Sequence, residues 1–426
     1  MRPLTDNPVT DPAEDVFHFG PYVDVLHDAV EQAAPLPLTV GVFGSWGTGK
    51  SSFLRLWQRQ LANQQVHTIW FNPWKYDRKV EVWAALLHTI LAEMEEKTGL
   101  KDKARRLAKA ATWLSVRAGL GTAATLATGG MVKSGDVDQL LTDLSEGDAE
   151  QYRQINRFEN DFRDAVEEFV GPDGRLVIFV DDLDRCTPES AMTVLESLKL
   201  FLGESSCVFV LALDLDVLAA IATSKFGEAL RDAPAEVVSG MAYLDKIVQL
   251  PFFLPDVGFD TLRGAFAPYI SEMADDATFW ELLRRGLGAN PRRLKRYVNV
   301  FNMAVAVATA QVNAPLTREF QLQLAILLVI RSRHREFFHL LAAEPGSWRT
   351  LASYFERVQD DPSEREQHRL SLPRQLNHFD GDRVLELLLT QRGDGRVTPP
   401  EPETVLSMIS TLRSAAGPDQ PRPTGD

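Results

Sequence analysis

The sequence predicts an α/β protein: a three-layer α/β/α sandwich with a mostly parallel sheet, followed by an α-helical lid and a helical C-terminal extension. Two observations lead to this prediction. Apolar runs alternate with helical patterns through the first two-thirds of the chain, which is typical of parallel strands covered by helices. After Pro255 the strand signals stop and only helical periodicity continues. The expected strands are Leu38–Phe43, His67–Phe71, Leu176–Val180, Cys207–Leu213 and Ile247–Leu250.

The third and fourth expected strands are near-continuous apolar runs, so we place them at the centre of the sheet with both faces buried. Beyond Pro255, apolar residues recur at helical spacing over several segments. The expected helices there are Phe259–Met273, Phe279–Leu287, Pro291–Gln311, Phe320–Leu341 and Trp348–Val358.

The composition along the chain predicts where its parts begin and end. An insertion at about residues 97–150 separates the second and third strands; it begins basic, becomes apolar and ends acidic. The last residues are rich in proline, glycine and polar side chains, which favours disorder. We therefore expect an α/β core over residues 1–255, a helical lid over 256–340, a helical extension over 341–412 and a disordered tail over 413–426.

Charge and cysteine content restrict the surroundings of the protein. The 426 residues carry a formal net charge of −14, so the surface as a whole repels nucleic acid and anionic membranes. Cys186 and Cys207 form no CxxC pair and no metal-type cluster, which favours reduced thiols in a cytoplasmic protein. Within residues 107–133, the stretch Gly119–Val132 is uncharged, but Arg117 interrupts the apolar run and glycine and threonine dilute it, whereas a membrane-spanning helix needs about 20 apolar residues. Packing on protein is the favoured interpretation, and membrane association stays open.

The most specific motif is a glycine loop between the first strand and the helix that follows it. Its residues match G-x-x-x-x-G-K-[ST] in full, with glycines that let backbone N–H groups turn toward a phosphate at a helix N-terminus. Lys50 is expected to reach the β- and γ-phosphates, and Ser51 to give its hydroxyl to Mg²⁺. The predicted ligands are therefore ATP and Mg²⁺. The expected nucleotide contacts are Gly44, Ser45, Trp46, Gly47, Thr48, Gly49, Lys50, Ser51 and Ser52.

Carboxylates follow the third and fourth strands. Asp181 is expected to hold Mg²⁺ through water, and Asp182 to orient and deprotonate the attacking water. Successive residues of a strand point to opposite sides, so the two carboxylates cannot do the same job. An ordinary acidic turn is the alternative. After the fourth strand, Asp214 would lie between the loop and the acidic strand end, either as a sensor of the γ-phosphate or as a helix cap.

A basic helix start follows in the lid, with Asn290 as its cap and Pro291 at the first helical position. Arg292 and Arg293 in the first turn oppose the helix dipole, and a nearby anion would reverse this cost. A bound triphosphate would be such an anion, which would make the helical lid sensitive to hydrolysis. A solvated basic face that pairs with acidic side chains and a local nucleic-acid patch are the alternatives.

Several motifs together resemble the KAP family of P-loop NTPases, which belongs to the ASCE group and is related to the STAND and AAA+ ATPases. The resemblance runs from about residue 15 to about residue 310. That family inserts membrane pairs between its two nucleotide motifs, but here the apolar part of the insertion is shorter and interrupted. The motifs that carry it, besides the loop, are FNPW at Phe71–Trp74 with Trp83 beyond it, DDLDR at Asp181–Arg185, YLDKIVQLPFFLP at Tyr243–Pro255 and NPRRLKRYVN at Asn290–Asn299.

The resemblance implies a P-loop NTPase fold and an ATPase in which Lys50 and Asp182 are catalytic. Arg292 or Arg293 would be the sensor arginine of the lid, with the choice between them open. Phe17 and Phe19 are candidates for adenine contacts, although an apolar staple for the next helix explains them almost as well. Trp70 and Trp74 are assigned to the core or a domain interface.

The expected function is Mg²⁺-dependent ATP binding and hydrolysis by a molecular switch or assembly ATPase. The resemblance extends this to bacterial anti-phage defence with a separate protein partner or effector, and self-association stays open. An ATP-dependent scaffold with negligible turnover is the main alternative. A small-molecule kinase lacks a defined acceptor site in the sequence, and DNA translocation is disfavoured by the acidic charge balance.

Overall fold

The computed structural model describes residues 3–76, 82–98, 107, 148–201, 206–214, 216–217, 247–270, 272–361, 363, 365–390 and 397–417. The chain divides into two compact units, which are described here one at a time. The α/β unit comprises Pro8–Pro255. The helical unit comprises Asp256–Asp426 together with the N-terminal segment that ends at Asn7.

A parallel sheet in the order β2-β3-β4-β1-β5 forms the centre of the α/β unit. The first four strands have the bounds expected from the sequence: β1 is Leu38–Phe43, β2 His67–Phe71, β3 Leu176–Val180 and β4 Cys207–Leu213. Every residue of β3 and β4 is buried, as expected for central strands covered on both faces. The carboxyl ends of these four strands therefore meet at one edge of the sheet.

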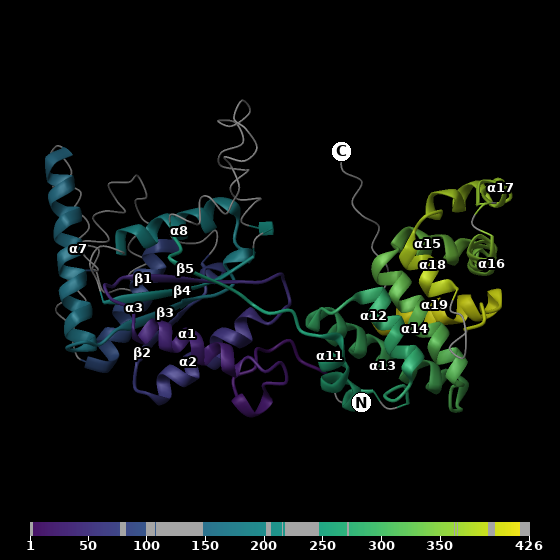
Figure 1. Cartoon of the computed structure of the whole chain (residues 1–426), viewed down its shortest axis with the longest axis horizontal. Helices are drawn as coiled ribbons and strands as arrows, with labels where there is room; N and C mark the ends of the chain where they lie inside the picture. The colour runs from purple at the N-terminus through teal and green to yellow at the C-terminus, as the bar shows by residue number, and fades with distance from the viewer. Residues whose placement is uncertain are drawn as a thin grey trace. The chain divides into compact units, whose positions relative to one another are not determined.

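Helices cover both faces of this sheet (Figure 1). On one face, α1 (Gly20–Glu31) and α2 (Lys50–Asn63) pack on Val177 and Phe179 of β3. On the other face, α3 (Val82–Thr98), α7 (Asp148–Val170) and α8 (Pro188–Phe201) pack on the alternate residues of β3, including Ile178. Alternate side chains of β3 thus belong to two separate hydrophobic clusters, one on each face of the sheet. This is the predicted three-layer sandwich.

The fifth strand lies further along the chain than expected. The sequence predicts Ile247–Leu250, whereas β5 is Leu250–Phe253 and pairs with Val40–Phe43 of β1. Pro251 lies within it. Proline cannot donate a ladder hydrogen bond, but an edge strand tolerates it. Phe252 stacks on Phe53 of α2, with 5.3 Å between ring centroids, and this contact fixes the register that the prediction missed.

The helical unit consists of helices that differ from the expected ones at several ends. The segment expected as one helix, Phe320–Leu341, is broken at His334, which leaves the helical region with φ −124° and ψ 60°. The first helix ends at Phe266 rather than Met273. The C-terminal helix α19 continues to Ala416, so residues 413–416, which were expected to belong to the disordered tail, are helical. The helices are α11 (Phe259–Phe266), α12 (Ala277–Leu287), α13 (Pro291–Val312), α14 (Arg318–Arg333), α15 (Arg335–Ala343), α16 (Ser347–Asp360), α17 (Arg365–Leu370), α18 (Arg383–Leu389) and α19 (Pro402–Ala416).

The structure also bears on the N-terminal segment and on the insertion between the second and third strands. The sequence predicts the first residues as part of the α/β core, but the segment up to Asn7 packs with the helical unit, for reasons given by its contacts with α13. The ends of the expected insertion are helical, in α3 and α7. Between them only residue 107 is described, so the remainder of the stretch at 107–133 lies outside the described residues.

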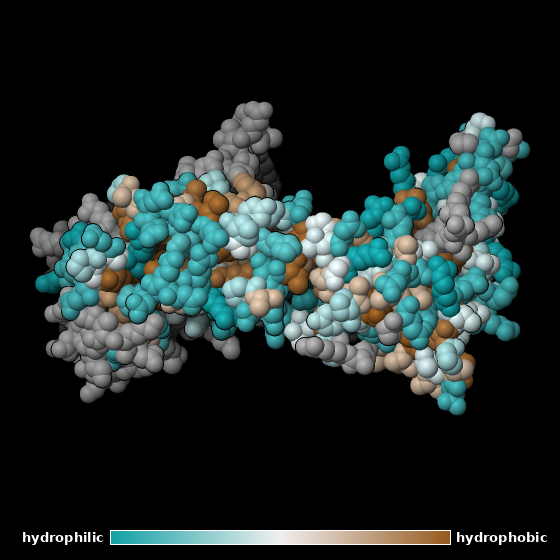
Figure 2. Space-filling view, turned by 60° about the horizontal axis from the view of Figure 1, so that its bottom comes forward, coloured by the Kyte–Doolittle hydropathy of each residue, from teal (hydrophilic) through white to brown (hydrophobic). Residues whose placement is uncertain are grey.

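The helices of the described part include none that is both long and apolar enough to cross a membrane. On the face that Figure 2 shows, hydrophobic residues occupy separate patches among hydrophilic and intermediate ones. The large apolar side chains exposed by half or more include Trp46, Trp74 and Phe253. All three belong to the α/β unit; Trp46 lies within the glycine loop and Trp74 within the FNPW motif.

The packing of α12 on α14 gives a stability prediction. A Cβ added to Gly286 of α12 would lie 2.5 Å from Cγ1 of Val329, a buried β-branched side chain with little rotamer freedom. We expect Gly286→Ala to lower the unfolding free energy of the helical unit by about 1–3 kcal/mol, despite the better helix propensity of alanine. Gly264→Ala in α11 is the matched control, because a Cβ there meets nothing within 4 Å. Urea unfolding measures both, and equal stability of the two variants would contradict the packing.

Candidate functional site

The glycine loop connects β1 to α2 at the carboxyl edge of the sheet. Gly47 and Gly49 adopt φ values of 88° and 111°, where any other residue would be strained. A Cβ on Gly49 would in addition lie 3.0 Å from the ring of Phe19. Both positions therefore require glycine, and the loop reaches the N-terminus of α2 at Lys50. Turns of this kind direct backbone N–H groups toward an anion at a helix start.

The other loop residues divide between the loop interior and its surface. The Thr48 hydroxyl donates to the carbonyl of Ser45 at 2.8 Å and closes the turn. The Trp46 side chain is 53% exposed. The Ser52 hydroxyl accepts from the backbone N–H of Val9 at 3.1 Å. Ser52 is therefore engaged in anchoring the N-terminal segment.

Lys50 is buried and has oxygen partners on both sides. Its ammonium donates to the carbonyl of Gly44 at 2.7 Å and to that of Ser45 at 3.3 Å. It also lies 3.6 Å from a carboxylate oxygen of Asp184, whose side chain is 8% exposed. The ammonium thus sits over the mouth of the loop. A phosphate there would give it charge-assisted hydrogen bonds in place of the neutral carbonyls.

Ser51 and Asp181 meet across the sheet edge. The Ser51 hydroxyl donates to Asp181 Oδ1 at 3.1 Å, and Asp181 itself is 6% exposed. Burial raises the pKa of Asp181, and the neighbouring charge of Asp182 raises it further. Mg²⁺ is commonly held by one or two protein oxygens together with phosphate oxygens, so this pair fits such an ion. The ion would supply the positive charge that this buried carboxylate lacks.

Asp182 takes a different set of partners from Asp181. It lies just past the strand in the left-handed region, at φ 61°. The Asn72 amide donates to Asp182 Oδ2 at 2.7 Å, and Arg185 Nε lies 2.6 Å from Asp182 Oδ1. Both carboxylate oxygens therefore have a donor, and Asp182 is held at the edge of the site by residues from the ends of β2 and β3.

Asp214 lies where the strand order places it, at the end of β4 between β1 and β3. It is 6% exposed, and its carboxylate accepts from the backbone N–H of Asp216 at 3.1 Å. The capping interpretation thus has a hydrogen bond in the described residues. Asp214 lies between the loop and the acidic strand end, and its role as a sensor of the γ-phosphate stays a prediction.

The aromatic residues near the loop are mostly structural. Phe19 is 1% exposed and packs edge-on against Phe53, with ring centroids 5.6 Å apart, so it supports the loop from inside the core. Phe17 is partly buried against the same cluster. Trp70 lies between Phe179 and the guanidinium of Arg55, which is 3.4 Å from its ring centroid. These contacts favour the staple interpretation for Phe19 and a core role for Trp70.

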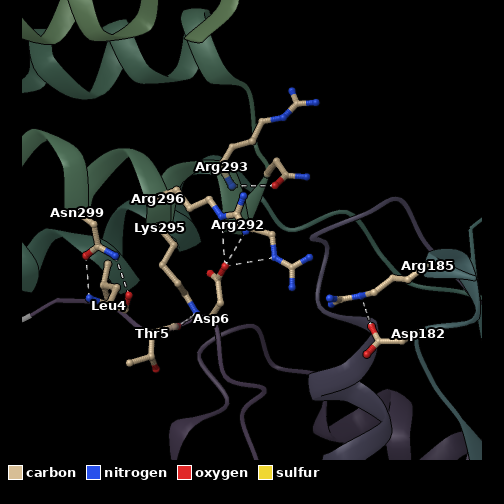
Figure 3. Close-up of polar contacts among 11 residues, drawn as sticks. Leu4, Thr5, Asp6, Asp182, Arg185, Arg292, Arg293, Lys295, Arg296 and Asn299 are labelled. Carbon is tan, nitrogen blue, oxygen red and sulfur yellow. Dashed lines mark hydrogen bonds and ion pairs between the residues drawn. The ribbon is translucent and has the colours of Figure 1, made fainter. Parts of the chain in front are cut away.

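The basic helix start belongs to the helical unit and begins as expected. Asn290 caps α13 by accepting from the backbone N–H of Arg293 at 3.0 Å. Arg292 Nε lies 3.8 Å from a carboxylate oxygen of Asp6. The exposed Arg293 guanidinium points away from Asp6 (Figure 3) and has no acidic partner among the described residues. The two arginines that the sequence leaves equivalent are therefore in different electrostatic surroundings.

Sequence reasoning missed three residues that contact the predicted catalytic groups. Asn72 and Arg185 hold Asp182, and Asp184 lies beside Lys50. Asn72 belongs to the FNPW motif and directly follows β2. Because polar residues that follow parallel strands gather at one edge of the sheet, this position could have indicated a contact with Asp182. Arg185 also lies over the Trp74 ring, 5.3 Å from its centroid; Trp74 is 50% exposed and, unlike Trp70, does not belong to the core.

One sequence-family model and two known proteins are similar to this chain. A sequence model described as the KAP family P-loop domain matches residues 19–308, which is more than half of the chain. The chain is 25% identical over 169 residues to the uncharacterized protein MJ0182 of Methanocaldococcus jannaschii, covering 33% of this chain and 87% of that protein. It also aligns with the structure of the ORC2 protein of Aeropyrum pernix (ADPNP-ADP complexes), with a TM-score of 0.38 and 14% identity over 96% of this chain and 97% of that one.

The raised pKa of Asp181 gives a prediction with a defined sign. Because its pKa in the folded protein is above the unfolded value, the stability it contributes is complete below the unfolded pKa and is lost as pH rises through the folded pKa. Asp181→Asn removes this loss. We expect the ligand-free variant to melt above the wild type at about pH 7.5 and to match it below about pH 4.

Magnesium reverses the comparison. With ATP present, Mg²⁺ should raise the melting temperature of the wild type further than ATP with chelator does, and it should add nothing in Asp181→Asn. Thermal unfolding across pH, with and without Mg²⁺, measures both effects. A ligand-free variant that melts below the wild type at neutral pH would contradict the assignment of a costly buried charge to Asp181.

Proposed function

We propose, since this chain belongs to the KAP family of P-loop NTPases, that it hydrolyses ATP with Mg²⁺ and acts as a molecular switch. The observation that carries the proposal is the contact of Ser51 with Asp181 at the carboxyl edge of the sheet. A phosphate loop from β1 and a buried carboxylate from β3 meet there, with Asp182 beside them on separate partners. Nucleotide binding alone requires the phosphate loop and Asp181, whereas a second carboxylate, Asp182, suits hydrolysis.

In this proposal, separate groups of residues bind the phosphates, the Mg²⁺ ion and the attacking water. Backbone N–H groups of the loop and Lys50 would hold the phosphates, while Ser51 and Asp181 would hold Mg²⁺, which neutralises charge that develops on the phosphate oxygens. Asp182 would orient the attacking water once one of its oxygens is released from Asn72 or Arg185. As found here, both oxygens of Asp182 accept a donor, which describes a resting site.

For the helical unit we propose Arg293 as the arginine that senses the γ-phosphate. Its guanidinium is exposed and without an acidic partner among the described residues, so an incoming phosphate would not have to displace a carboxylate. Arg292 already faces Asp6. Hydrolysis would remove the anion that Arg293 binds, and the helical unit would respond by a change in position.

The switch is further proposed to act on a separate protein in the cytoplasm, with anti-phage defence as the setting suggested by family analogy. Within the described residues no group of three or more His, Cys, Asp or Glu side chains is placed to hold a metal ion. We propose that the effector activity resides in that partner.

A scaffold with negligible turnover is the second candidate. The observation that favours it is the double hydrogen bonding of Asp182, because each of its oxygens already accepts one donor and fewer acceptor sites remain for a water. The scaffold predicts ATP-dependent assembly at normal affinity and a turnover that Asp182→Asn leaves unchanged.

Steady-state phosphate release decides between the two candidates. We expect Lys50→Ala to abolish release through loss of phosphate binding, and Asp182→Asn to lower kcat by at least about a hundredfold while ATP affinity is retained. Binding is measured by titration with a fluorescent ATP analogue. Turnover that survives Lys50→Ala would remove the site assignment, and an Asp182→Asn variant as active as the wild type would leave only the scaffold.

The contact between Asn72 and Asp182 gives a separate prediction. Asn72→Ala frees Asp182 Oδ2, so we expect basal turnover to rise by about twofold to tenfold. The double variant Asn72→Ala/Asp182→Asn should be as inactive as Asp182→Asn alone, because Asn72 acts through that carboxylate. A single Asn72→Ala variant slower than the wild type would instead mean that Asn72 holds Asp182 in its productive orientation.

A further inference from the structure

The N-terminal strap, defined here as Leu4–Asp6, lies along α13 of the helical unit and is held by every one of its residues (Figure 3). The backbone N–H of Leu4 donates to Asn299 Oδ1 at 2.8 Å, and the Asn299 amide donates back to the Leu4 carbonyl at 2.7 Å. Lys295 donates to the carbonyl of Thr5 at 2.9 Å. The backbone of the strap is thus held by side chains of α13.

Asp6 completes the strap at its C-terminal end. Its carboxylate accepts from Arg296 Nη2 at 3.1 Å and lies 3.8 Å from Arg292 Nε. The α13 partners are spaced at i, i+3, i+4 and i+7 from Arg292, which puts them on one face of the helix. Because Leu4 meets Asn299 and Asp6 meets Arg292, the strap runs antiparallel to α13 and leaves it near the helix start, where Arg293 lies.

Immediately after the strap the chain is anchored to the α/β unit. The backbone N–H of Val9 donates to Ser52 Oγ at 3.1 Å, one residue after the proposed Mg²⁺ ligand Ser51. Arg59 of α2 donates to the carbonyl of Thr10 at 3.1 Å and lies 3.5 Å from Asp11. The first turns of α2 and of α13 are therefore each bound to the same short stretch of chain.

Two residues, Asn7 and Pro8, separate the two anchors. Fully extended chain between the Cα atoms of Asp6 and Val9 cannot exceed about 11 Å, since each residue spans at most about 3.6 Å. The boundary between the units falls within this junction, and the chain crosses it again between Pro255 and Asp256. Any movement of the helical unit beyond that reach must break the hydrogen bonds of one anchor.

We infer that the strap is a tether that positions the start of α13 for the nucleotide loop, with Asp6 as its positioning residue. The inference rests on the proposed function. Ion pairs as exposed as Asp6–Arg296 add little to stability, so stabilisation by this pair does not account for the position of Asp6. A short tether does confine the helical unit, and confinement raises the effective concentration of Arg293 at the phosphate loop. Asp6 also satisfies the neighbouring cations and leaves Arg293 available.

Lengthening the junction tests the tether while both anchors stay intact. We would insert Gly-Ser-Gly-Ser between Asn7 and Pro8, and place the same insertion after Ala314 in the exposed loop between α13 and α14 as the control. The junction insertion should lower kcat by about threefold to tenfold with ATP affinity unchanged, because the reach grows while the nucleotide loop does not change. The control insertion should match the wild type.

Hydrogen exchange supplies a readout that does not need turnover. The Leu4 amide should stay protected in the junction variant, which shows that the strap is still docked. A non-hydrolysable ATP analogue should add protection to the first turns of α13 in the wild type but not in the junction variant. Asp6→Asn should fall between the two in kcat, and Asp6→Glu should restore the wild-type rate, since the charge and its partners are kept.

The outcomes separate the two proposals. A junction variant with wild-type kcat and wild-type analogue-dependent protection of α13 would overturn the tether and leave the ATPase proposal standing. A wild type that releases no phosphate, yet whose α13 is protected by the analogue only with the short junction, would support the tether and overturn hydrolysis. Loss of activity equal in the junction and Ala314 insertions would also overturn the tether, because length at the junction would then have no special effect.

Discussion

Every contact of the phosphate site depends on the parallel pairing of β1, β4 and β3 in a sheet that is buried on both faces. Val180 pairs with Leu211, and Phe43 with Leu213, so the loop and the acidic strand end leave the sheet at the same edge. A slip of one residue would exchange the residues of the two hydrophobic clusters. Register is therefore fixed by apolar packing, and the Ser51–Asp181 distance is a consequence of that packing.

The same burial makes the ligand-free site electrostatically unfavourable. Asp181 is almost fully enclosed and has Asp182 and Asp184 as neighbours, whose charges together with burial raise its pKa. Lys50 offsets part of this charge, but its closest partners are loop carbonyls. A divalent cation with a triphosphate brings the opposite charges to each of these groups. Under the proposed function, relief of this unfavourable charge would contribute to the free energy of binding.

Sequence patterns located the elements whose signal is local. The first four strands, the glycine loop and the Asn290 cap each depend on neighbours in the sequence, and the structure has them at the expected residues. β5 was misplaced because its register is set by the packing of Phe252 on Phe53, some two hundred residues away. The break at His334 was hidden by apolar spacing that continues through it. Two sets of contacts could not be predicted, because they form only when distant segments meet. They are the contact of Asn72 with Asp182, which Arg185 completes, and the pairing of Asp6 with α13.

The start of α13 shows why its charge pattern could not be interpreted from the helix alone. Two arginines in a first turn oppose the helix dipole and call for an anion. The sequence suggested a bound triphosphate, but Asp6, 290 residues away from Arg296, already supplies a carboxylate. It does so for Arg292 and Arg296 and not for Arg293. Arg293 is therefore left without an acidic partner among the described residues, and the segment that neutralises the other two arginines reaches the anchor on Ser52 three residues after Asp6. A phosphate that pairs with Arg293 would complete the charge balance that Asp6 begins.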